Sequence, residues 1–116
     1  MPPVPQDLDL LRGTLDLFVL KTLSWGPMHG LAIVRWIESA SNSQLQIEEG
    51  ALYPALHRME QRGWLSAEWG ITDNNRKAKY YRLTPRGRKQ FATQLSIWER
   101  YTKMAAALLS ARGATV

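Results

Sequence analysis

The chain has 116 residues, about the length of one ordinary domain, and carries 15 Lys and Arg against 10 Asp and Glu, a formal charge of +5. Hydrophobic residues make up 45% of the sequence, which is enough for a packed core and argues against a disordered tail. The sequence contains no cysteine, which excludes disulfide scaffolds, thiol nucleophiles and thiolate zinc sites.

Membrane insertion and export are not expected. The most apolar stretch, Leu8–Leu23, contains four charged residues, whereas a membrane-spanning helix needs about 20 nearly uncharged residues. The first residues, Met1–Pro5, lack the basic region and the apolar run of a signal peptide. We therefore expect a cytoplasmic protein.

The first predicted helix begins after Asp9, a suitable N-cap, and ends near Ser24, before the helix-breaking segment Trp25–Pro27. Its apolar residues cover nearly the whole circumference: Leu10, Leu11, Leu15, Leu17, Phe18, Val19, Leu20 and Leu23. A helix that is apolar on all sides is buried on more than one side, so we expect part of its cover to come from a second chain.

Two further helices are predicted over about His29–Ala40 and Gly50–Arg62, the later one stopping at Gly63. Apolar residues spaced four and then three apart define their buried stripes: Ile33, Ile37 and Ala40 in one, and Leu52, Leu56 and Met59 in the other. Because proline is tolerated in the first turn of a helix, Pro54 favours a start at about Gly50–Leu52.

A β-hairpin follows, since residues 65–69 and 80–83 alternate with period two and are rich in aromatic side chains. The segment Gly70–Lys77 between these strands has turn chemistry and ends in two cations. Thr84 and Pro85 then predict an N-cap and a proline at the first position of the next helix.

The last predicted helix runs from about Pro85 to Ala111. It carries a heptad stripe of Phe91, Leu95, Trp98, Thr102, Ala105 and Leu109, with a second stripe of Ile97, Tyr101, Met104 and Leu108 beside it. Two adjacent stripes exceed what one helix needs against its own domain, which indicates contact with a second copy.

This order predicts a mainly α fold with a β-hairpin: a winged helix-turn-helix DNA-binding domain over residues 9–84 and a long C-terminal dimerisation helix over residues 85–112. The third helix is then the recognition helix and the hairpin is the wing. Nine basic and three acidic residues lie between positions 57 and 89, a net +6, so the rest of the chain sums to −1. Such a basic block is typical of polyanion binding, although a merely solvated surface is the alternative.

Candidate DNA contacts lie opposite the apolar stripe of the third helix and in the wing. They are Gly50, Ala51, Tyr53, Pro54, His57 and Arg58 on the helix, and Arg76, Lys77 and Lys79 in the wing. Small residues let the backbone approach DNA, Tyr53 can donate to a phosphate, and Arg58 can pair with a phosphate or a guanine. In the alternative interpretation, Tyr53 packs at the helix edge and the charged groups are only solvated.

These residues resemble the PadR family of transcriptional regulators, in its short type with one C-terminal helix. The resemblance covers about residues 9–111 and is carried by segments 26–30, 50–60, 62–64 and 75–87. Its most specific parts are Leu-Tyr-Pro-Ala-Leu, which begins at Leu52, and Tyr-Arg-Leu-Thr-Pro-Arg-Gly, which begins at Tyr81. The sequence looks closest to a subgroup found in acidobacteria. It departs from the family pattern at 31–32, where an aromatic and an acid are frequent, and at 48–49, where two glutamates replace small polar caps.

The resemblance implies a homodimeric bacterial repressor that binds a palindromic operator, with Tyr53 on the DNA and Lys77 and Lys79 in the wing. It also implies that the last helix dimerises, partly against the partner's first helix. The dimer-interface candidates are Leu15, Phe18, Phe91, Leu95, Trp98, Tyr101, Ala105 and Leu109. Some family members bind small planar aromatic effectors between the halves of the dimer, which makes Trp98 the candidate effector residue; packing of Trp98 in the dimer core is the alternative.

An enzyme is not expected. His29 and His57 lie on separate helices, and the neighbouring Glu48 and Glu49 diverge on a helix instead of forming a carboxylate pair. No glycine-rich phosphate loop or metal-ligand spacing appears, so we expect no catalytic residue, no cofactor and no metal. The alternatives from other classes are a winged-helix protein-interaction module without specific DNA binding and a binder of double-stranded RNA.

Overall fold

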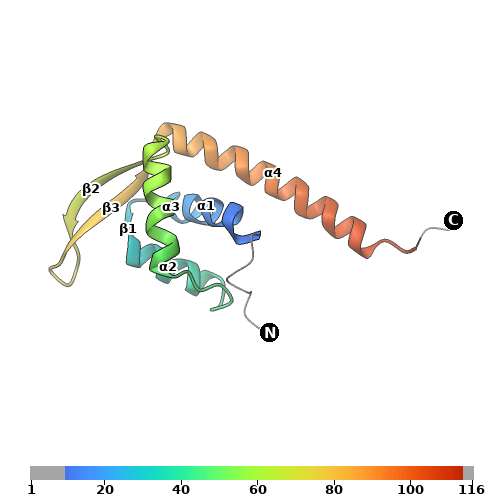
Figure 1. Ribbon diagram of the computed structural model, residues 1–116, viewed down its shortest axis with the longest axis horizontal. Coiled ribbons are helices and arrows are strands. Elements are labelled where there is room, and N and C mark those ends of the chain that lie inside the picture. Colours follow the sequence, from blue (N-terminus) through green and yellow to red (C-terminus); the bar gives the residue numbers. More distant parts are fainter. Residues whose placement is uncertain (1–9, 114–116) are drawn as a thin grey trace.

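The computed structural model describes residues 10–113 and contains the elements of a winged helix in the predicted order (Figure 1). They are α1 (Leu10–Leu23), β1 (Met28–His29), α2 (Gly30–Ala40), α3 (Glu49–Gln61), β2 (Leu65–Ile71), β3 (Lys77–Leu83) and α4 (Pro85–Ser110). The predicted fold class, mainly α with a hairpin and a long last helix, is confirmed. The predicted N-cap, Asp9, lies outside the described residues.

The sheet has one strand more than the sequence predicted. Its order is β1-β3-β2, and both neighbouring pairs are antiparallel. The hairpin pairs Leu65 with Leu83 at its base and Ile71 with Lys77 near its tip, so both strands are longer than expected. In β1, Met28 and His29 pair with β3, but two residues are too few to show a period.

The helix boundaries are set largely by local capping. His29 lies at the N-cap of α2, where its Nδ1 accepts a hydrogen bond from the Ala32 backbone N–H at 3.3 Å. Gly63 follows the end of α3 with φ +79°, a left-handed conformation that favours glycine. Both ends therefore agree with the sequence prediction.

The start of α3 differs from the prediction. The helix begins at Glu49, so Pro54 lies in its second turn and not in its first. Proline has no N–H to donate to the Gly50 carbonyl four residues earlier. Gly50 is exposed, so water can satisfy that carbonyl, and the helix tolerates the proline there.

A compact joint connects the wing to α4. The Thr84 hydroxyl accepts from the Gly87 N–H at 3.0 Å and donates to the Gly63 carbonyl at 2.6 Å. The Thr84 N–H donates to the Trp64 carbonyl at 3.0 Å. Gly87 packs so closely on this carbonyl that a Cβ would overlap it. The predicted Thr84 cap is therefore confirmed, and it also joins α4 to the segment between α3 and β2.

The core lies between the three short helices and the base of the sheet. Its buried hydrophobic residues are Val19, Leu20, Leu23, Ile33, Ile37, Leu45, Leu52, Ala55, Leu56, Met59, Leu65, Tyr81 and Leu83. The helical stripes predicted for α2 and α3 supply five of these thirteen residues, but Ala40, the sixth stripe residue, is exposed. Leu45 enters from the loop between α2 and α3, where no periodic pattern exists to predict its burial.

The two halves of α4 have different surroundings. The first half packs on its own domain: Phe91 contacts the core, and the Trp98 ring stands edge-on to Phe18 at 6.5 Å between centroids. The second half extends away from the domain (Figure 1) and leaves Tyr101, Leu108 and Leu109 exposed, Leu109 by 84%. The first residues of the predicted heptad stripe therefore pack against their own chain, whereas Leu109 at its end is exposed.

Candidate nucleic-acid interface

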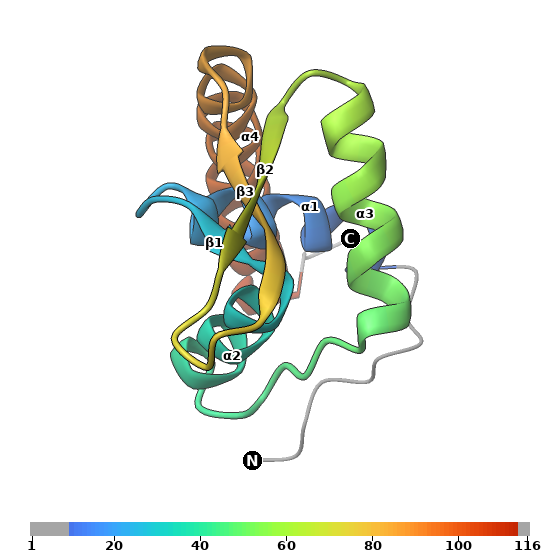
Figure 2. The same cartoon turned by 90° about the vertical axis from the view of Figure 1, so that its left-hand side faces the viewer.

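The helix α3 has one buried and one exposed face. Leu52, Ala55, Leu56 and Met59 are buried against the domain. Five of the predicted contact residues, Gly50, Ala51, Tyr53, Pro54 and His57, are exposed on the rest of the helix surface. Figure 1 shows α3 and the hairpin on the side of the molecule away from the C-terminal end of α4, and Figure 2 shows both from that side. The exposed face of α3 and the wing therefore belong to one end of the fold.

The Tyr53 ring packs against Gly30, a glycine of a different helix. A Cβ on Gly30, at the start of α2, would lie 2.6 Å from the Tyr53 hydroxyl oxygen. The absence of a side chain at Gly30 therefore leaves room for the phenol ring, which remains partly exposed on its other side. One side of the Tyr53 ring therefore packs and the other is accessible, and its contact with DNA stays a prediction. The sequence analysis did not identify this role of Gly30.

The tip of the wing is a tight turn that presents basic side chains. The Thr72 N–H donates to the Arg76 carbonyl at 2.8 Å, and Asn75 adopts a left-handed φ of 58°. Asparagine tolerates this conformation better than most residues. Arg76 and Lys77 leave the turn with exposed side chains, as expected for a surface that meets a polyanion.

A groove of about 610 Å³ lies between Tyr53 on α3, the start of α2 and the wing. Its lining includes four basic side chains and one acidic side chain: Arg35, Arg76, Lys77, Lys79 and Asp73. The sequence analysis missed Arg35, because it lies on α2, far in sequence from the basic block. Only the packing of α2 against the wing brings it to the same groove.

Two of the predicted contact residues are engaged inside the protein. The Arg58 guanidinium forms an ion pair with Asp16 on α1. The Lys79 Nζ lies 3.2 Å from a carboxylate oxygen of Glu60 on α3. These pairs connect α1 to α3 and the wing to α3. Arg58 and Lys79 thus differ from Arg76 and Lys77, which are exposed at the tip.

Asp16 is a buried carboxylate on α1. Burial raises the pKa of Asp16 above its ordinary value, and the charge and hydrogen bond of Arg58 oppose part of that rise. The Arg58 side chain is 42% exposed and the Asp16 side chain only 12%. Arg58 therefore compensates a largely buried carboxylate while its own outer edge stays in water.

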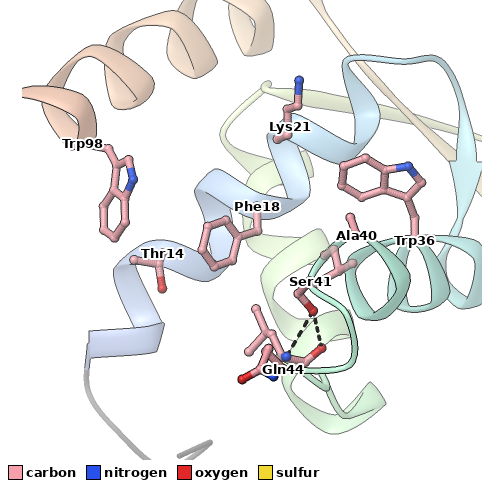
Figure 3. A pocket seen from close by; sticks show the side chains of 10 residues that line it. Thr14, Phe18, Lys21, Trp36, Ala40, Ser41, Gln44 and Trp98 are labelled. Atoms are coloured by element: carbon pink, nitrogen blue, oxygen red, sulfur yellow. Dashed lines mark hydrogen bonds between the residues drawn. The ribbon is translucent and has the colours of Figure 1, made fainter. Parts of the chain in front are cut away.

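A second cavity, of about 360 Å³, lies between α1, α2 and α4. Figure 3 shows Phe18, Trp36 and Trp98 around this space, with Lys21 at its edge. The sequence identified Trp98 and Phe18 for this region but not Trp36, which was assigned no role. The predicted interface residues differ in how far their own chain covers them. Tyr101 and Leu109 are exposed, and the others are half-buried: Leu15, Phe18, Phe91, Leu95, Trp98 and Ala105.

The described part of the chain shows neither of two other kinds of site. No helix within residues 10–113 is long and apolar enough to cross a membrane. In that same range, no group of three His, Asp or Glu side chains is arranged to hold a metal ion.

The chain is similar to known transcriptional regulators. The sequence profile of the transcriptional regulator PadR-like family matches residues 19–93. The transcriptional regulator Rv3488 of Mycobacterium tuberculosis is 33% identical over 78 residues, which cover 66% of this chain and 68% of that protein.

Solved structures agree with this similarity. A transcriptional regulator from Clostridium thermocellum is 29% identical, with a TM-score of 0.78 and coverage of 85% of this chain and 96% of the other. A PadR-family regulator from Eggerthella lenta is 32% identical, with a TM-score of 0.74 and coverage of 90% and 88%. The members of this family are transcriptional regulators and not enzymes. The chain belongs to the PadR-like family of transcriptional regulators.

Proposed function

We propose that this protein is a cytoplasmic, sequence-specific DNA-binding repressor that acts as a homodimer on a palindromic operator. The observation that carries the proposal is the basic groove between the exposed face of α3 and the wing. A basic surface in this position suits a DNA backbone that passes between a helix in the major groove and a wing beside it. In this proposal, residues 9–84 bind DNA and residues 85–112 dimerise.

The proposed contacts have separate roles. Gly50, Ala51, Tyr53, Pro54 and His57 face base edges and nearby phosphates, because they are exposed on α3. Arg76 and Lys77 contact phosphates from the wing. Arg58 and Lys79 border the same surface and add positive potential to it, while their ion pairs hold α3 against α1 and the wing.

Dimerisation is supported by the uncovered second half of α4. Its large apolar residues Tyr101, Met104, Leu108 and Leu109 are all more than half exposed. The helix α1 offers a partly buried apolar surface at Leu15 and Phe18. A two-fold dimer would present two α3 helices to half-sites about one helical turn, roughly 34 Å, apart.

A salt titration on selected DNA tests this function. A duplex enriched from random sequence by the wild-type protein is compared with its scrambled version at several salt concentrations. With about eight phosphate contacts per dimer, log affinity should fall with log salt at a slope near −7. Replacing Arg76 and Lys77 with alanine removes two cations per protomer and should flatten the slope by about 3.6.

Lys103→Ala is the matched control, because Lys103 is exposed on α4, outside the groove lining. A flat salt response, or equal binding of selected and scrambled duplexes, would exclude the operator function. Equal binding to an RNA duplex of the same sequence would support the RNA alternative instead. A protein-interaction module would bind neither duplex with this salt dependence.

The cavity beside Trp98 supports a small aromatic effector as a second ligand. Its lining combines the rings of Phe18, Trp36 and Trp98 with the side chain of Lys21 at the edge, while the Lys21 Nζ lies over the Trp25 ring. Quenching of tryptophan fluorescence by planar aromatic compounds, lost in Trp98→Phe, is the expected result. Equal quenching in both proteins would leave Trp98 with a packing role in the dimer core.

A further inference from the structure

Two large apolar side chains on the wing have little cover from their own chain. Trp69 is 63% exposed and Ile71 is 69% exposed, although both belong to a regular strand, β2. The strand register places Trp69 opposite Lys79 and Ile71 opposite Lys77, so the apolar and basic side chains share one face of the hairpin. Two large apolar side chains exposed together on one face form an apolar patch, and such a patch can mark a binding site.

This face of the hairpin looks toward α3. At its base, Tyr81 is buried in the core, and the Lys79 Nζ reaches Glu60 on α3. The opposite face is occupied differently, because the Tyr80 ring covers Gly70 and contacts His29 edge-on at 5.4 Å. Trp69 therefore lies on the side of the groove, and it forms part of the groove lining.

The surroundings of Trp69 indicate the chemistry of its partner. The Lys77 Nζ lies 5.8 Å from the centre of the Trp69 ring, and Arg35 and Arg76 line the same groove. An apolar protein partner would gain nothing from so many cations. A nucleic acid satisfies both features, since phosphates meet the cations and the sugars and base edges offer flat apolar surface.

We propose that Trp69 is a DNA-contact residue, which packs against deoxyribose and base edges in the minor groove while Lys77 meets the adjacent phosphate. This proposal rests on the proposed function and deepens it. The wing then contributes an apolar contact whose strength does not depend on salt, in addition to its charge. Ile71, nearer the tip on the same face, extends this apolar contact along the minor groove of the DNA.

Trp69→Ala tests the proposal, with Trp25→Ala as the matched control. Trp25 is 66% exposed, which is nearly the same as Trp69, but it lies in the turn after α1, outside the groove lining. Binding is measured to the duplex enriched by the wild-type protein, across a range of salt. We expect Trp69→Ala to weaken binding by about 5- to 150-fold with an unchanged salt slope, as the loss of one aromatic contact to a nucleotide does. Trp25→Ala should bind like the wild type, because Trp25 lies outside the groove lining.

The salt slope separates the two kinds of wing contact. Lys77→Ala should lower affinity and flatten the slope, since it removes a phosphate contact. Trp69→Phe retains a flat ring and should keep most of the affinity, while the change in tryptophan emission on adding DNA should be lost. This fluorescence result holds even if the alanine variant folds poorly.

Three outcomes would overturn the proposal. Undiminished affinity of Trp69→Ala excludes the contact and assigns the exposed ring to another partner. A slope change equal to that of Lys77→Ala means that Trp69 only positions the lysine. Absence of any DNA preference in the wild-type protein overturns the proposed function itself, and the role of Trp69 with it.

Discussion

Replacing Arg58 with alanine should destabilise the fold more than it weakens DNA binding. Arg58 lies on α3, but its guanidinium is paired with Asp16 on α1. Removing it leaves a carboxylate with only 12% of its side chain exposed and without the cation that pairs with it. A charge that loses its partner in a buried place carries most of its desolvation cost uncompensated.

The magnitude lies between two reference cases. Breaking a fully buried ion pair costs about 3–5 kcal/mol, whereas exposed pairs contribute about 0.2–1 kcal/mol. Asp16 resembles the first case, but 42% of the Arg58 side chain is exposed, so solvent screening reduces its effect. We therefore expect the free energy of unfolding to fall by about 1.5–2.5 kcal/mol at neutral pH.

The effect should depend on pH in a defined direction. Burial already raises the pKa of Asp16, and removing Arg58 raises it further. A carboxyl group with a raised pKa in the folded state binds its proton more tightly there than in the unfolded chain, so stability falls as pH rises through that pKa. The destabilisation by Arg58→Ala should therefore be greatest at neutral pH. It should decrease as the pH falls toward 3.8, the ordinary pKa of an aspartate, because protonated Asp16 needs no cation.

Urea unfolding followed by circular dichroism, at one protein concentration, measures these differences. Arg88→Ala is the control, because Arg88 is an exposed cation on α4. Adding Asp16→Asn to Arg58→Ala should recover most of the lost stability, since the uncompensated charge is gone. An Arg58→Ala protein of unchanged stability whose DNA binding has a flatter salt slope would refute this reasoning.

Two further predictions concern α4. Gly87→Ala should lower the free energy of unfolding by at least about 1–3 kcal/mol, because its Cβ would overlap the Trp64 carbonyl. Gly113→Ala is the control and should leave the stability unchanged, because the space around Gly113 is open. Equal stability of the two variants would mean that the backbone at Thr84 and Gly87 shifts to accommodate the methyl group. Leu108→Asp combined with Leu109→Asp should convert the proposed dimer into a folded monomer in sedimentation, whereas Ser110→Asp should leave it intact; a dimer that survives both changes uses another surface.

Local sequence patterns predicted most of the fold. The cap at Thr84, the proline at the start of α4 and the glycine after α3 depend on neighbouring residues alone, so the sequence contains all the information needed. The strand β1 was missed because two residues show no alternation, and its pairing with β3 is a tertiary contact. The sequence analysis placed the start of α3 too late, because it assumed that Pro54 must lie in the first turn of the helix. The exposure of Gly50 to water permits the proline one turn later.

The site was predicted less completely, because its geometry depends on contacts between distant residues. The partner of Arg58 is 42 residues away in the chain and that of Lys79 is 19 residues away, so a helical wheel cannot reveal either ion pair. Arg35 and Gly30 reach the groove only through the packing of α2. Trp69 was assigned to a half-buried strand, and only the structure shows how much of its ring remains exposed.

The hydrogen bonds of Thr84 fix the direction of α4 relative to the wing. No flexible linker separates β3 from α4, because the single residue between them is fixed by its hydrogen bonds to the segment after α3. The 26 residues of α4 span about 39 Å, so a tilt of about 10° at the joint displaces its far end by about 7 Å. In the proposed dimer, the angle at which the two α4 helices cross fixes the distance between the two wings. A small change in the packing between these helices would therefore change the spacing of DNA half-sites that the protein can bind.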